Sequence, residues 1–168
     1  MSDLESFKLM SDSETETINI GYYIGKNASI SDVILIYGEM GAGKTRLTSG
    51  ISMGIGNKVS VRSPSFVIVN EYPGEKILYH CDFYRIKNVY EAYDLDLESK
   101  SDLGIIVVEW PDNFEEIFSQ NILKVRIEIS KNFYIKRSNL LNNNPCIMLM
   151  AGQGKRLKKI NSKKFLLT

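Results

Sequence analysis

The stretch Val33-Ile-Leu-Ile-Tyr-Gly-Glu-Met-Gly-Ala-Gly-Lys-Thr45 decides the fold of this chain. Its first five residues are a continuous β-branched and apolar run, which is typical of a strand buried on both faces of a parallel sheet. The next eight satisfy the pattern G-x-x-x-x-G-K-[ST], a glycine-rich turn between a strand and a helix. Residues 44–53 can form that helix, which Gly54 and Gly56 would end. The stretch therefore predicts an α/β fold built around a P-loop.

The glycine-rich turn has the chemistry of a phosphate site. Glycine permits positive φ angles and lets the backbone approach a phosphate closely. The N–H groups of the turn then face an anion at a helix N-terminus, where the helix dipole adds to the attraction. Lys44 would reach the β- and γ-phosphates, and the Thr45 hydroxyl would bind Mg²⁺. We therefore expect ATP or ADP and Mg²⁺ as cofactors. The residues expected to contact the nucleotide are Gly38, Glu39, Met40, Gly41, Ala42, Gly43, Lys44, Thr45 and Arg46.

Two acidic residues follow apolar runs and are candidates for the chemistry at the metal. Glu109 ends the run Gly104-Ile-Ile-Val-Val-Glu109, and a P-loop needs such a carboxylate to hold Mg²⁺. Asp82 follows another apolar run and could orient the attacking water, add to the metal shell or only pair with Arg85. His80, the only histidine, is interpreted as structural because it offers no ligand set. The candidate catalytic residues are thus Lys44, Asp82 and Glu109, and the candidate metal ligands are Thr45 and Glu109.

Other segments complete a mostly parallel sheet flanked by helices. Ser13 and Glu16 form a capping box that predicts a helix through about Lys26. Strand-like runs on both sides of Pro73-Gly-Glu75 predict an inserted antiparallel hairpin. Spacing further predicts a helix over residues 88–100, a short helix over residues 113–118 and an edge or half-exposed strand over residues 122–129.

Composition limits the class of protein. At 168 residues, 43% of them hydrophobic, the chain has the size and composition of one globular domain with a short remainder. Its apolar runs of about five residues fall far below the ~18 of a membrane span. The acidic N-terminus lacks a secretory signal, which predicts a cytoplasmic protein. Cys81 and Cys146 match no metal-ligand spacing and are expected to be reduced and mostly buried.

Charge divides the chain into two parts. Residues 1–128 hold 12 basic and all 20 acidic residues, a net charge of −8, whereas residues 129–168 hold 9 basic and no acidic residues. The basic part is either a solvated terminus or a contact for an anionic partner such as RNA. We expect a P-loop ATPase domain over residues 1–138 and a basic tail over residues 139–168.

Four segments, taken in order, resemble the TsaE family, the bacterial ATPase of tRNA threonylcarbamoyladenosine (t6A) biosynthesis. They are the P-loop, Ser63-Pro-Ser-Phe66 running to Val69-Asn-Glu-Tyr72, Tyr79-His-Cys-Asp-Phe-Tyr-Arg85, and Val108-Glu-Trp-Pro111. The resemblance covers about residues 7–137. It implies Mg²⁺-dependent ATP binding and slow hydrolysis in complex with the TsaB and TsaD proteins, with tRNA reached through that complex. The hydrolysis would support modification of adenosine 37 in tRNAs that read ANN codons. The resemblance implies no membrane among the partners.

The resemblance also implies site positions. Lys44, Thr45, Asp82, Glu109 and Trp110 would be functional, and Ser63, Pro64, Ser65 and Phe66 would form a switch-like loop over the nucleotide. The family commonly has a second threonine where this chain has Arg46, and threonine where it has Ser65. Ser65 keeps the hydroxyl, and the Arg46 guanidinium could meet an α-phosphate. Trp110 would sense the nucleotide or touch a partner, or else cap the sheet as a core aromatic.

The stretch Pro145-Cys-Ile-Met-Leu-Met-Ala-Gly-Gln-Gly-Lys-Arg-Leu157 resembles the start of a sugar-phosphate nucleotidyltransferase. Only about twenty residues carry this likeness, too few for a second active site. The stretch is interpreted as a truncated fusion or as a basic tail without a known role.

Two other function classes share the P-loop. A small-molecule kinase normally needs an arginine-bearing lid over an acceptor pocket. Between the P-loop and Glu109 the arginines are Arg46, Arg62 and Arg85, which form no arginine-rich segment. A non-hydrolysing nucleotide-sensing module, in which ATP sets the affinity for a partner, is the third class.

Overall fold

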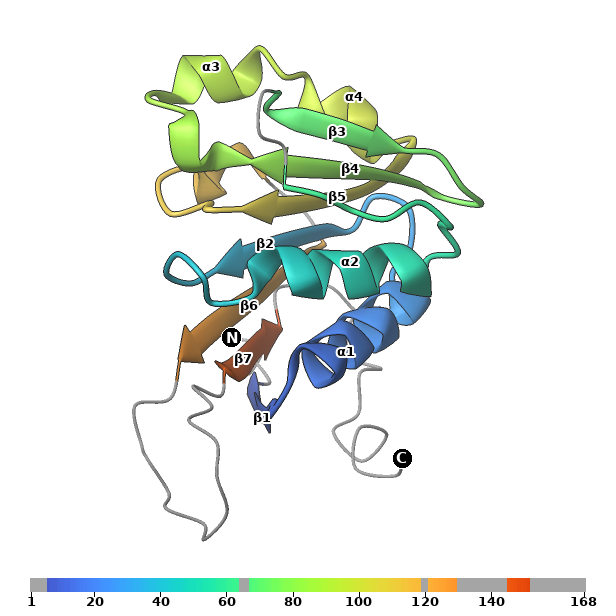
Figure 1. Ribbon diagram of the computed structural model, residues 1–168. Helices are drawn as coiled ribbons and strands as arrows, with labels where there is room; N and C mark the ends of the chain where they lie inside the picture. Colours follow the sequence, from blue (N-terminus) through green and yellow to red (C-terminus); the bar gives the residue numbers. More distant parts are fainter. Residues whose placement is uncertain (1–5, 64–66, 119–120, 130–144, 152–168) are drawn as a thin grey trace, which may run out of the picture.

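The computed structural model describes residues 6–63, 67–118, 121–129 and 145–151. Within these residues a seven-stranded sheet has the order β1-β7-β6-β2-β5-β4-β3 (Figure 1). The strands are β1 (Ser6–Met10), β2 (Val33–Tyr37), β3 (Val69–Tyr72), β4 (Ile77–Asp82), β5 (Gly104–Glu109), β6 (Ile122–Ile129) and β7 (Pro145–Ala151). The four central strands β6, β2, β5 and β4 are parallel, and the pairs β1–β7, β6–β7 and β3–β4 are antiparallel.

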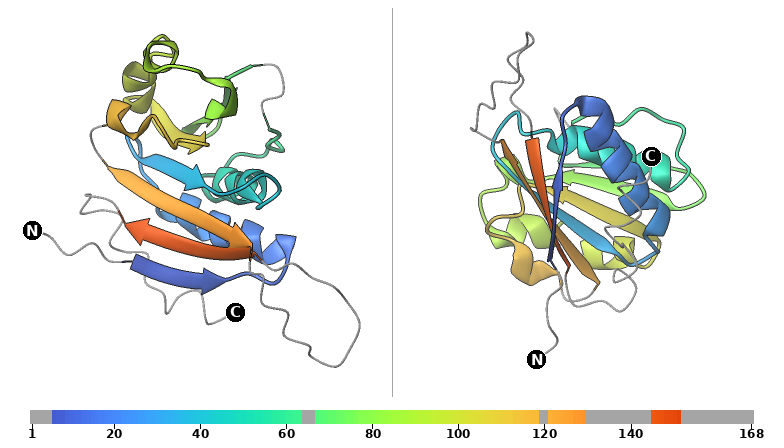
Figure 2. Two further views of the ribbon diagram at one scale, coloured as in Figure 1. Left: turned by 90° about the vertical axis from the view of Figure 1, so that its left-hand side faces the viewer. Right: turned by 90° about the horizontal axis from the view of Figure 1, so that it is seen from below.

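Helices lie on both faces of the sheet (Figures 1 and 2). On one face are α1 (Glu14–Asn27) and α2 (Lys44–Gly54), and on the other are α3 (Val89–Tyr93), α4 (Leu97–Ser101) and the 3₁₀ helices η1 (Phe83–Arg85) and η2 (Glu115–Ile117). This arrangement confirms the predicted α/β class. None of the described helices has the length and apolar content needed to cross a membrane.

Strand β2 lies at the centre and is buried along its whole length, as predicted. Ile34 and Ile36 pack in the cluster under α1 and α2, whereas Val33, Leu35 and Tyr37 pack in the cluster on the opposite face. Because side chains alternate along a strand, one continuous apolar run supplies both cores. The P-loop therefore begins directly after a buried strand at the centre of the sheet.

The predicted helix cap and hairpin are both present, although the Glu16 carboxylate accepts a hydrogen bond from the backbone N–H of Asp12 and not, as in a complete capping box, from that of Ser13. The Ser13 hydroxyl accepts a hydrogen bond from the backbone N–H of Glu16 (3.2 Å) at the start of α1. Strands β3 and β4 pair antiparallel across the turn that contains Pro73 and Gly74. Cys81 on β4 is a buried free thiol as expected, and burial raises its pKa to about 12. Cys146 belongs to β7, whose side chains lie outside the described set.

Three predicted elements differ in the structure: the helices expected over residues 88–100 and 113–118, and the strand expected over residues 122–129. The helix expected over residues 88–100 is divided into α3 and α4, because Asp96 adopts a left-handed conformation (φ 50°) that aspartate tolerates better than most residues. The turn lets Ala92 and Leu97 both reach the same core. The short helix expected over residues 113–118 is the 3₁₀ helix η2.

Strand β6 has the predicted alternation, with Leu123, Val125 and Ile127 buried, but it is not an edge strand. Strand β7 pairs with it on the side away from β2 and with β1 on its other side. The nucleotidyltransferase-like stretch thus begins with a strand of the same sheet. The proposed domain division at residue 138 and the fusion origin of the tail stay predictions.

Helices α1 and α2 approach each other at backbone distance through four glycines. A Cβ atom on Gly21 or Gly25 would lie 2.2 or 2.1 Å from a carbonyl oxygen of α2. A Cβ atom on Gly50 or Gly54 would lie 2.0 or 2.1 Å from a carbonyl oxygen of α1. Each helix therefore carries two glycines four residues apart on the face that meets the other, and α1 fixes the helix that follows the P-loop.

We expect Gly25→Ala to destabilise the protein although alanine favours helices. Propensity alone would stabilise an exposed helix by about 1 kcal/mol, but overpacking a tight contact costs about 1–3 kcal/mol. Urea denaturation measures the change, with Asn19→Ala on the exposed side of α1 as the control for propensity. A Gly25→Ala protein as stable as the wild type would contradict the close helix packing.

Candidate functional site

The loop between β2 and α2 has the backbone of a phosphate-binding turn. Gly38, Gly41 and Gly43 all have positive φ angles, of 148°, 81° and 101°. Gly43 is also the N-cap of α2. A Cβ atom on Gly38 would lie 2.6 Å from the carbonyl oxygen of Ile127 on β6, so this position has no room for a side chain. These constraints explain why the turn needs glycine at the positions where the motif has it.

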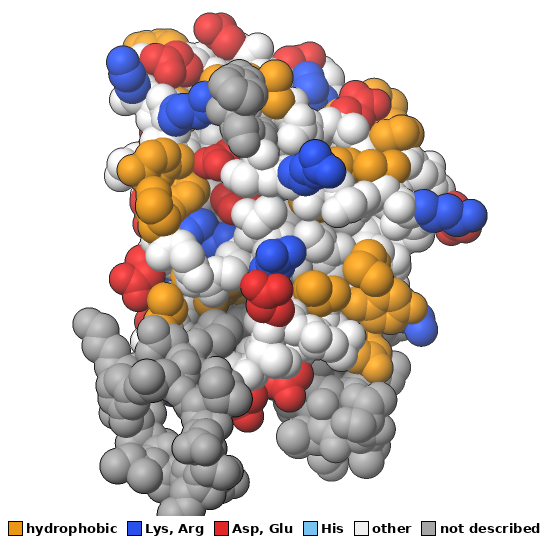
Figure 3. Space-filling view, in the orientation of Figure 1, with side chains coloured by type: hydrophobic (Ala, Val, Ile, Leu, Met, Phe, Trp, Pro, Cys, Tyr) orange, Lys and Arg blue, Asp and Glu red, His pale blue; other side chains and the backbone are white. Residues whose placement is uncertain are grey.

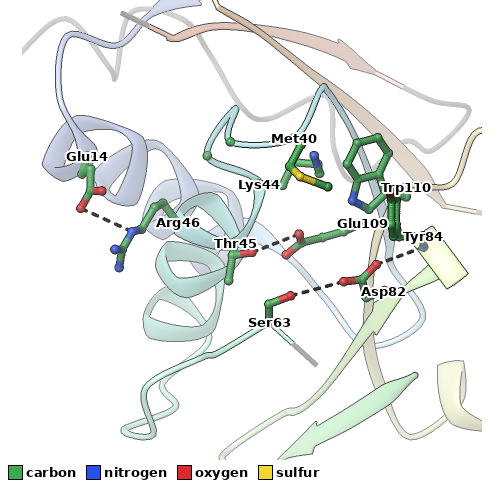
Figure 4. Close-up of a pocket in the computed structure, with 12 residues that line it drawn as sticks. Glu14, Met40, Lys44, Thr45, Arg46, Ser63, Asp82, Tyr84, Glu109 and Trp110 are labelled. Atoms are coloured by element: carbon green, nitrogen blue, oxygen red, sulfur yellow. Dashed lines mark hydrogen bonds and ion pairs between the residues drawn. The ribbon is translucent and has the colours of Figure 1, made fainter. Parts of the chain in front are cut away.

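A pocket of about 370 Å³ opens beside this loop, at the carboxyl ends of the parallel strands (Figure 4). It brings together residues from the P-loop, α1, α2 and the ends of β4 and β5. They are Glu14, Met40, Gly41, Gly43, Lys44, Thr45, Arg46, Ser63, Asp82, Tyr84, Glu109 and Trp110. In Figure 3 this left-hand side of the molecule carries an apolar patch next to acidic and basic side chains.

Lys44 is buried, with 5% of its surface exposed, and its ammonium is held by the loop itself. Its Nζ donates to the carbonyl oxygens of Gly38 (2.6 Å) and Glu39 (2.8 Å) and lies 3.6 Å from the centre of the Trp110 ring. Burial lowers the pKa of Lys44, and the nearby negative charge of Glu109 acts in the opposite direction. The pocket therefore contains a desolvated cation in front of the loop.

Glu109 is a buried carboxylate with donors on both oxygens. Its Oε2 accepts a hydrogen bond from the Thr45 hydroxyl (3.1 Å). Its Oε1 lies 2.8 Å from His80 Nε2 and 3.1 Å from the Thr48 hydroxyl, which shares its single proton between this oxygen and the carbonyl oxygen of Lys44 (3.0 Å). In the sheet, Glu109 pairs with Ile36 on β2. The strand that leads into the P-loop is thus the direct neighbour of the strand that ends in this carboxylate.

Asp82 lies next to Glu109, since the two residues pair in the register of β4 and β5. Its carboxylate accepts hydrogen bonds from the Ser63 hydroxyl (3.3 Å) and from the backbone N–H of Tyr84 (3.0 Å), which caps η1. The Arg85 guanidinium, considered above as its partner, donates to the carbonyl oxygen of Val67 (3.1 Å). Asp82 is therefore directed into the pocket by the turn that follows β4.

Trp110 follows Glu109 and has a strained backbone. Its φ of 60° is unusual for a bulky residue, and its N–H donates to the carbonyl oxygen of Ile36 (3.2 Å). Its ring lies 5.1 Å from that of Tyr84, which is 58% exposed. Such strain persists only where the surroundings enforce it, and it occurs most often at functional sites. Trp110 is partly buried: it packs against the core cluster on one face of the sheet and also covers Lys44.

The remaining predicted residues have different positions. Arg46 lines the pocket and pairs with Glu14 on α1 (3.4 Å), where both side chains are exposed. Ser63 contacts Asp82. Pro64, Ser65 and Phe66 lie outside the described residues, so their switch role stays a prediction.

Sequence reasoning missed four contributors: His80, Thr48, Tyr84 and Glu14. His80 and Thr48 are fully buried and contact Glu109. Alternation along β4 could have indicated His80, because residues two apart on a strand share a face and Asp82 was already a candidate. Thr48 is one helical turn after Lys44, but only the packing of α2 on β5 brings it to Glu109.

The residues of the pocket fit a nucleotide with Mg²⁺. Among the described residues, no group of three or more histidine, cysteine, aspartate or glutamate side chains could hold a metal ion alone. Mg²⁺ commonly binds through one or two carboxylates together with substrate phosphates, so a full protein cage is not required. The oxygens of Thr45 and Glu109, 3.1 Å apart, and the ammonium of Lys44 supply suitable groups.

Comparison with known proteins agrees with this geometry. The family model described as "Threonylcarbamoyl adenosine biosynthesis protein TsaE" matches residues 11–138. The chain belongs to the TsaE family. A TsaE of Rickettsia typhi is 30% identical over 135 residues, which cover 77% of this chain and 94% of that protein. A TsaE of Streptomyces coelicolor is 36% identical over 113 residues, covering 65% of this chain and 76% of that protein.

A solved structure supports the fold of this TsaE-family chain. The crystal structure of Bacillus subtilis YdiB is similar with a TM-score of 0.71 and 25% identity, covering 99% of this chain and 97% of the other. The fold of this chain is thus shared with a solved structure along nearly its whole length. The family assignment made from the four sequence segments is confirmed.

The lowered pKa of Lys44 has a measurable effect on stability. The folded protein releases this proton at a lower pH than the unfolded chain does, whose lysine has the ordinary value of 10.5. Between these two pKa values the unfolded chain binds more protons, so the free energy of unfolding rises with pH. We expect a smaller rise in Lys44→Met as the pH approaches 10.5 from below, measured by urea denaturation of both proteins. The same rise in both would mean that Lys44 is not desolvated.

Proposed function

We propose that this chain binds and hydrolyses ATP with Mg²⁺ to support the formation of t6A at adenosine 37 of tRNAs that read ANN codons. It would act in the cytoplasm as a partner of TsaB and TsaD. No membrane would take part. One observation carries the proposal: the buried Glu109 carboxylate accepts a hydrogen bond from the hydroxyl of Thr45 in the P-loop. Thr45 directly follows Lys44, whose ammonium is also buried.

The loop and Lys44 would bind the phosphates. The N–H groups at the start of α2 attract anions, and Lys44 supplies a full positive charge in the same place. Lys44 would exchange the carbonyl oxygens of Gly38 and Glu39 for phosphate oxygens, since both carbonyls belong to the loop that surrounds the ligand. A desolvated ammonium interacts more strongly with phosphate than an exposed one does, because less water has to be displaced.

Thr45 and Glu109 would bind the metal side. Bound Mg²⁺ would neutralise charge that develops on the phosphate oxygens during transfer. The Thr45 hydroxyl now donates to Glu109, so it would turn its oxygen lone pairs to the metal, and Glu109 Oε2 would become free on the same side. This exchange would keep both oxygens on one side of the pocket.

Asp82 would act on the water. It lies beside Glu109 at the end of the neighbouring strand and is directed into the pocket by the N–H of Tyr84. A carboxylate next to the proposed metal ligand can accept a proton from an attacking water molecule or orient it. Ser63 donates to the same carboxylate, which would link the start of the 63–66 segment to the state of the site.

We expect Glu109→Ala and Asp82→Ala to fail in different steps. Glu109→Ala should weaken the Mg²⁺-dependent part of ATP binding, because it removes the metal carboxylate. Asp82→Ala should leave ATP bound and slow turnover by about 10²-fold or more, as is typical of a removed acid–base group. Mg²⁺ titrations and single-turnover rates measure the two effects. Wild-type turnover in both variants would refute the assigned roles.

The site has few cations for the chemical step. Of the residues that line the pocket, Lys44 and Arg46 are basic and Glu14, Asp82 and Glu109 are acidic. Arg46 already pairs with Glu14. In other P-loop enzymes an arginine supplied by a partner raises the rate by roughly 10³–10⁵. A partner that adds positive charge is therefore needed for fast hydrolysis, and the exposed aromatic surface of Trp110 and Tyr84 offers it a contact.

We expect the purified chain to hydrolyse ATP slowly, at a rate similar to that of unassisted P-loop GTPases. Addition of TsaB and TsaD from the same source should raise the phosphate-release rate. Trp110→Ala should reduce this stimulation more than it weakens ATP binding, and Tyr90→Ala, another exposed aromatic outside the pocket, serves as the control. Fast hydrolysis by the isolated chain, or no response to the two proteins, would contradict the proposal.

A further inference from the structure

We propose that His80 is the positioning residue of Glu109: it holds one carboxylate oxygen so that the other stays directed to the metal side. The inference rests on the proposed function, because it deepens the role given to Glu109. The contact is a hydrogen bond of 2.8 Å between His80 Nε2 and Glu109 Oε1, from β4 to the adjacent β5. His80 is 0% and Glu109 3% exposed, so water does not compete for this bond.

The donors divide the carboxylate into two sides. Thr48 and His80 both contact Oε1, whereas Thr45 alone contacts Oε2 among the interactions described for Glu109. Thr45 is the P-loop residue that would turn toward Mg²⁺, and Oε2 would be released with it. Oε1 would keep its two donors in both states. The arrangement thus fixes the orientation of the side chain without occupying the oxygen that the metal needs.

The geometry assigns the donor to Nε2. An ionised carboxylate only accepts hydrogen bonds, so the proton of this bond belongs to the imidazole. His80 Nδ1 is buried and has no hydrogen-bond partner within the described residues. A buried polar atom without a partner has a cost, and a histidine that served only packing would be replaceable by an apolar side chain. Within the described residues, the hydrogen bond to Glu109 is the one that the imidazole makes, and its ring also lies 6.4 Å from the Tyr72 ring.

Loss of the His80 hydrogen bond would weaken Mg²⁺ binding but not the Mg²⁺-independent binding of the nucleotide. With only Thr48 on Oε1, the buried charge of Glu109 would be less satisfied and its carboxylate could turn toward Lys44. Residues that orient a metal ligand typically change metal affinity by about 10–100-fold when they are replaced. The P-loop backbone groups that would contact the phosphates lie between β2 and α2, away from β4, the strand of His80.

Two amides of different length test the contact. The Nε2 of glutamine can reach the position of histidine Nε2, whereas the shorter asparagine cannot. We expect His80→Asn to raise the Mg²⁺ concentration for half-maximal binding of a fluorescent ATP analogue by about 10-fold or more, and His80→Gln to restore most of it. Binding of the analogue in EDTA should be unchanged in both. If His80→Asn does not fold, His80→Leu provides the same comparison.

Leu78→Ala is the matched control, since Leu78 is fully buried on the same strand and faces the same side of the sheet. It should lower the melting temperature and leave the Mg²⁺ dependence unchanged. A wild-type Mg²⁺ dependence in His80→Asn would overturn the inference, as would a His80→Gln protein as weak as His80→Asn. Glu109→Gln, measured in parallel, separates the two proposals. If it shifts the Mg²⁺ dependence and His80→Asn does not, only the role of His80 is wrong; if neither does, the metal role of Glu109 fails.

Discussion

The buried charge of Glu109 is the constraint on which this site depends. A carboxylate in the interior requires hydrogen-bond donors, and here three side chains on two elements supply them: Thr45 and Thr48 on α2, and His80 on β4. The strand that carries Glu109 is bonded to β2 on one side and β4 on the other. One side chain thus joins the helix after the P-loop to the centre of the sheet, and a shift of any of these elements would leave the charge unsatisfied.

The position of α2 is fixed from its other side by α1. The glycines of the two helices allow contact between backbones, and none of the four positions has space for a methyl group. A helix held between a neighbouring backbone and the sheet has little freedom to move. The N–H groups at its start therefore remain directed at the loop, which is the preorganisation that phosphate binding needs.

Sequence reasoning identified the P-loop, its flanking strand and helix, the hairpin and both candidate carboxylates. These features depend on local chemistry: a buried run of five residues, glycines at fixed offsets, and an acid at a strand end. It did not find the role of His80 or the contact of Thr48, because these depend on which strand lies beside β5 and on the rotation of α2. The break at Asp96 was missed for a related reason, since the helical pattern of that segment does not show that Ala92 and Leu97 must reach one core.

The polar groups that line the pocket contact one another. Lys44 donates to two carbonyl oxygens of its own loop and lies under the Trp110 ring, and Thr45 donates to Glu109. Under the proposed function, a nucleotide would replace these contacts and so rearrange the residues that face the pocket opening. Under the same proposal, Trp110 would be the residue best placed to report that change. Its strained backbone is tied to β2 through Ile36, its ring covers Lys44, and its other neighbour Tyr84 is exposed. A single side chain therefore connects the buried ammonium to the exposed Tyr84 ring.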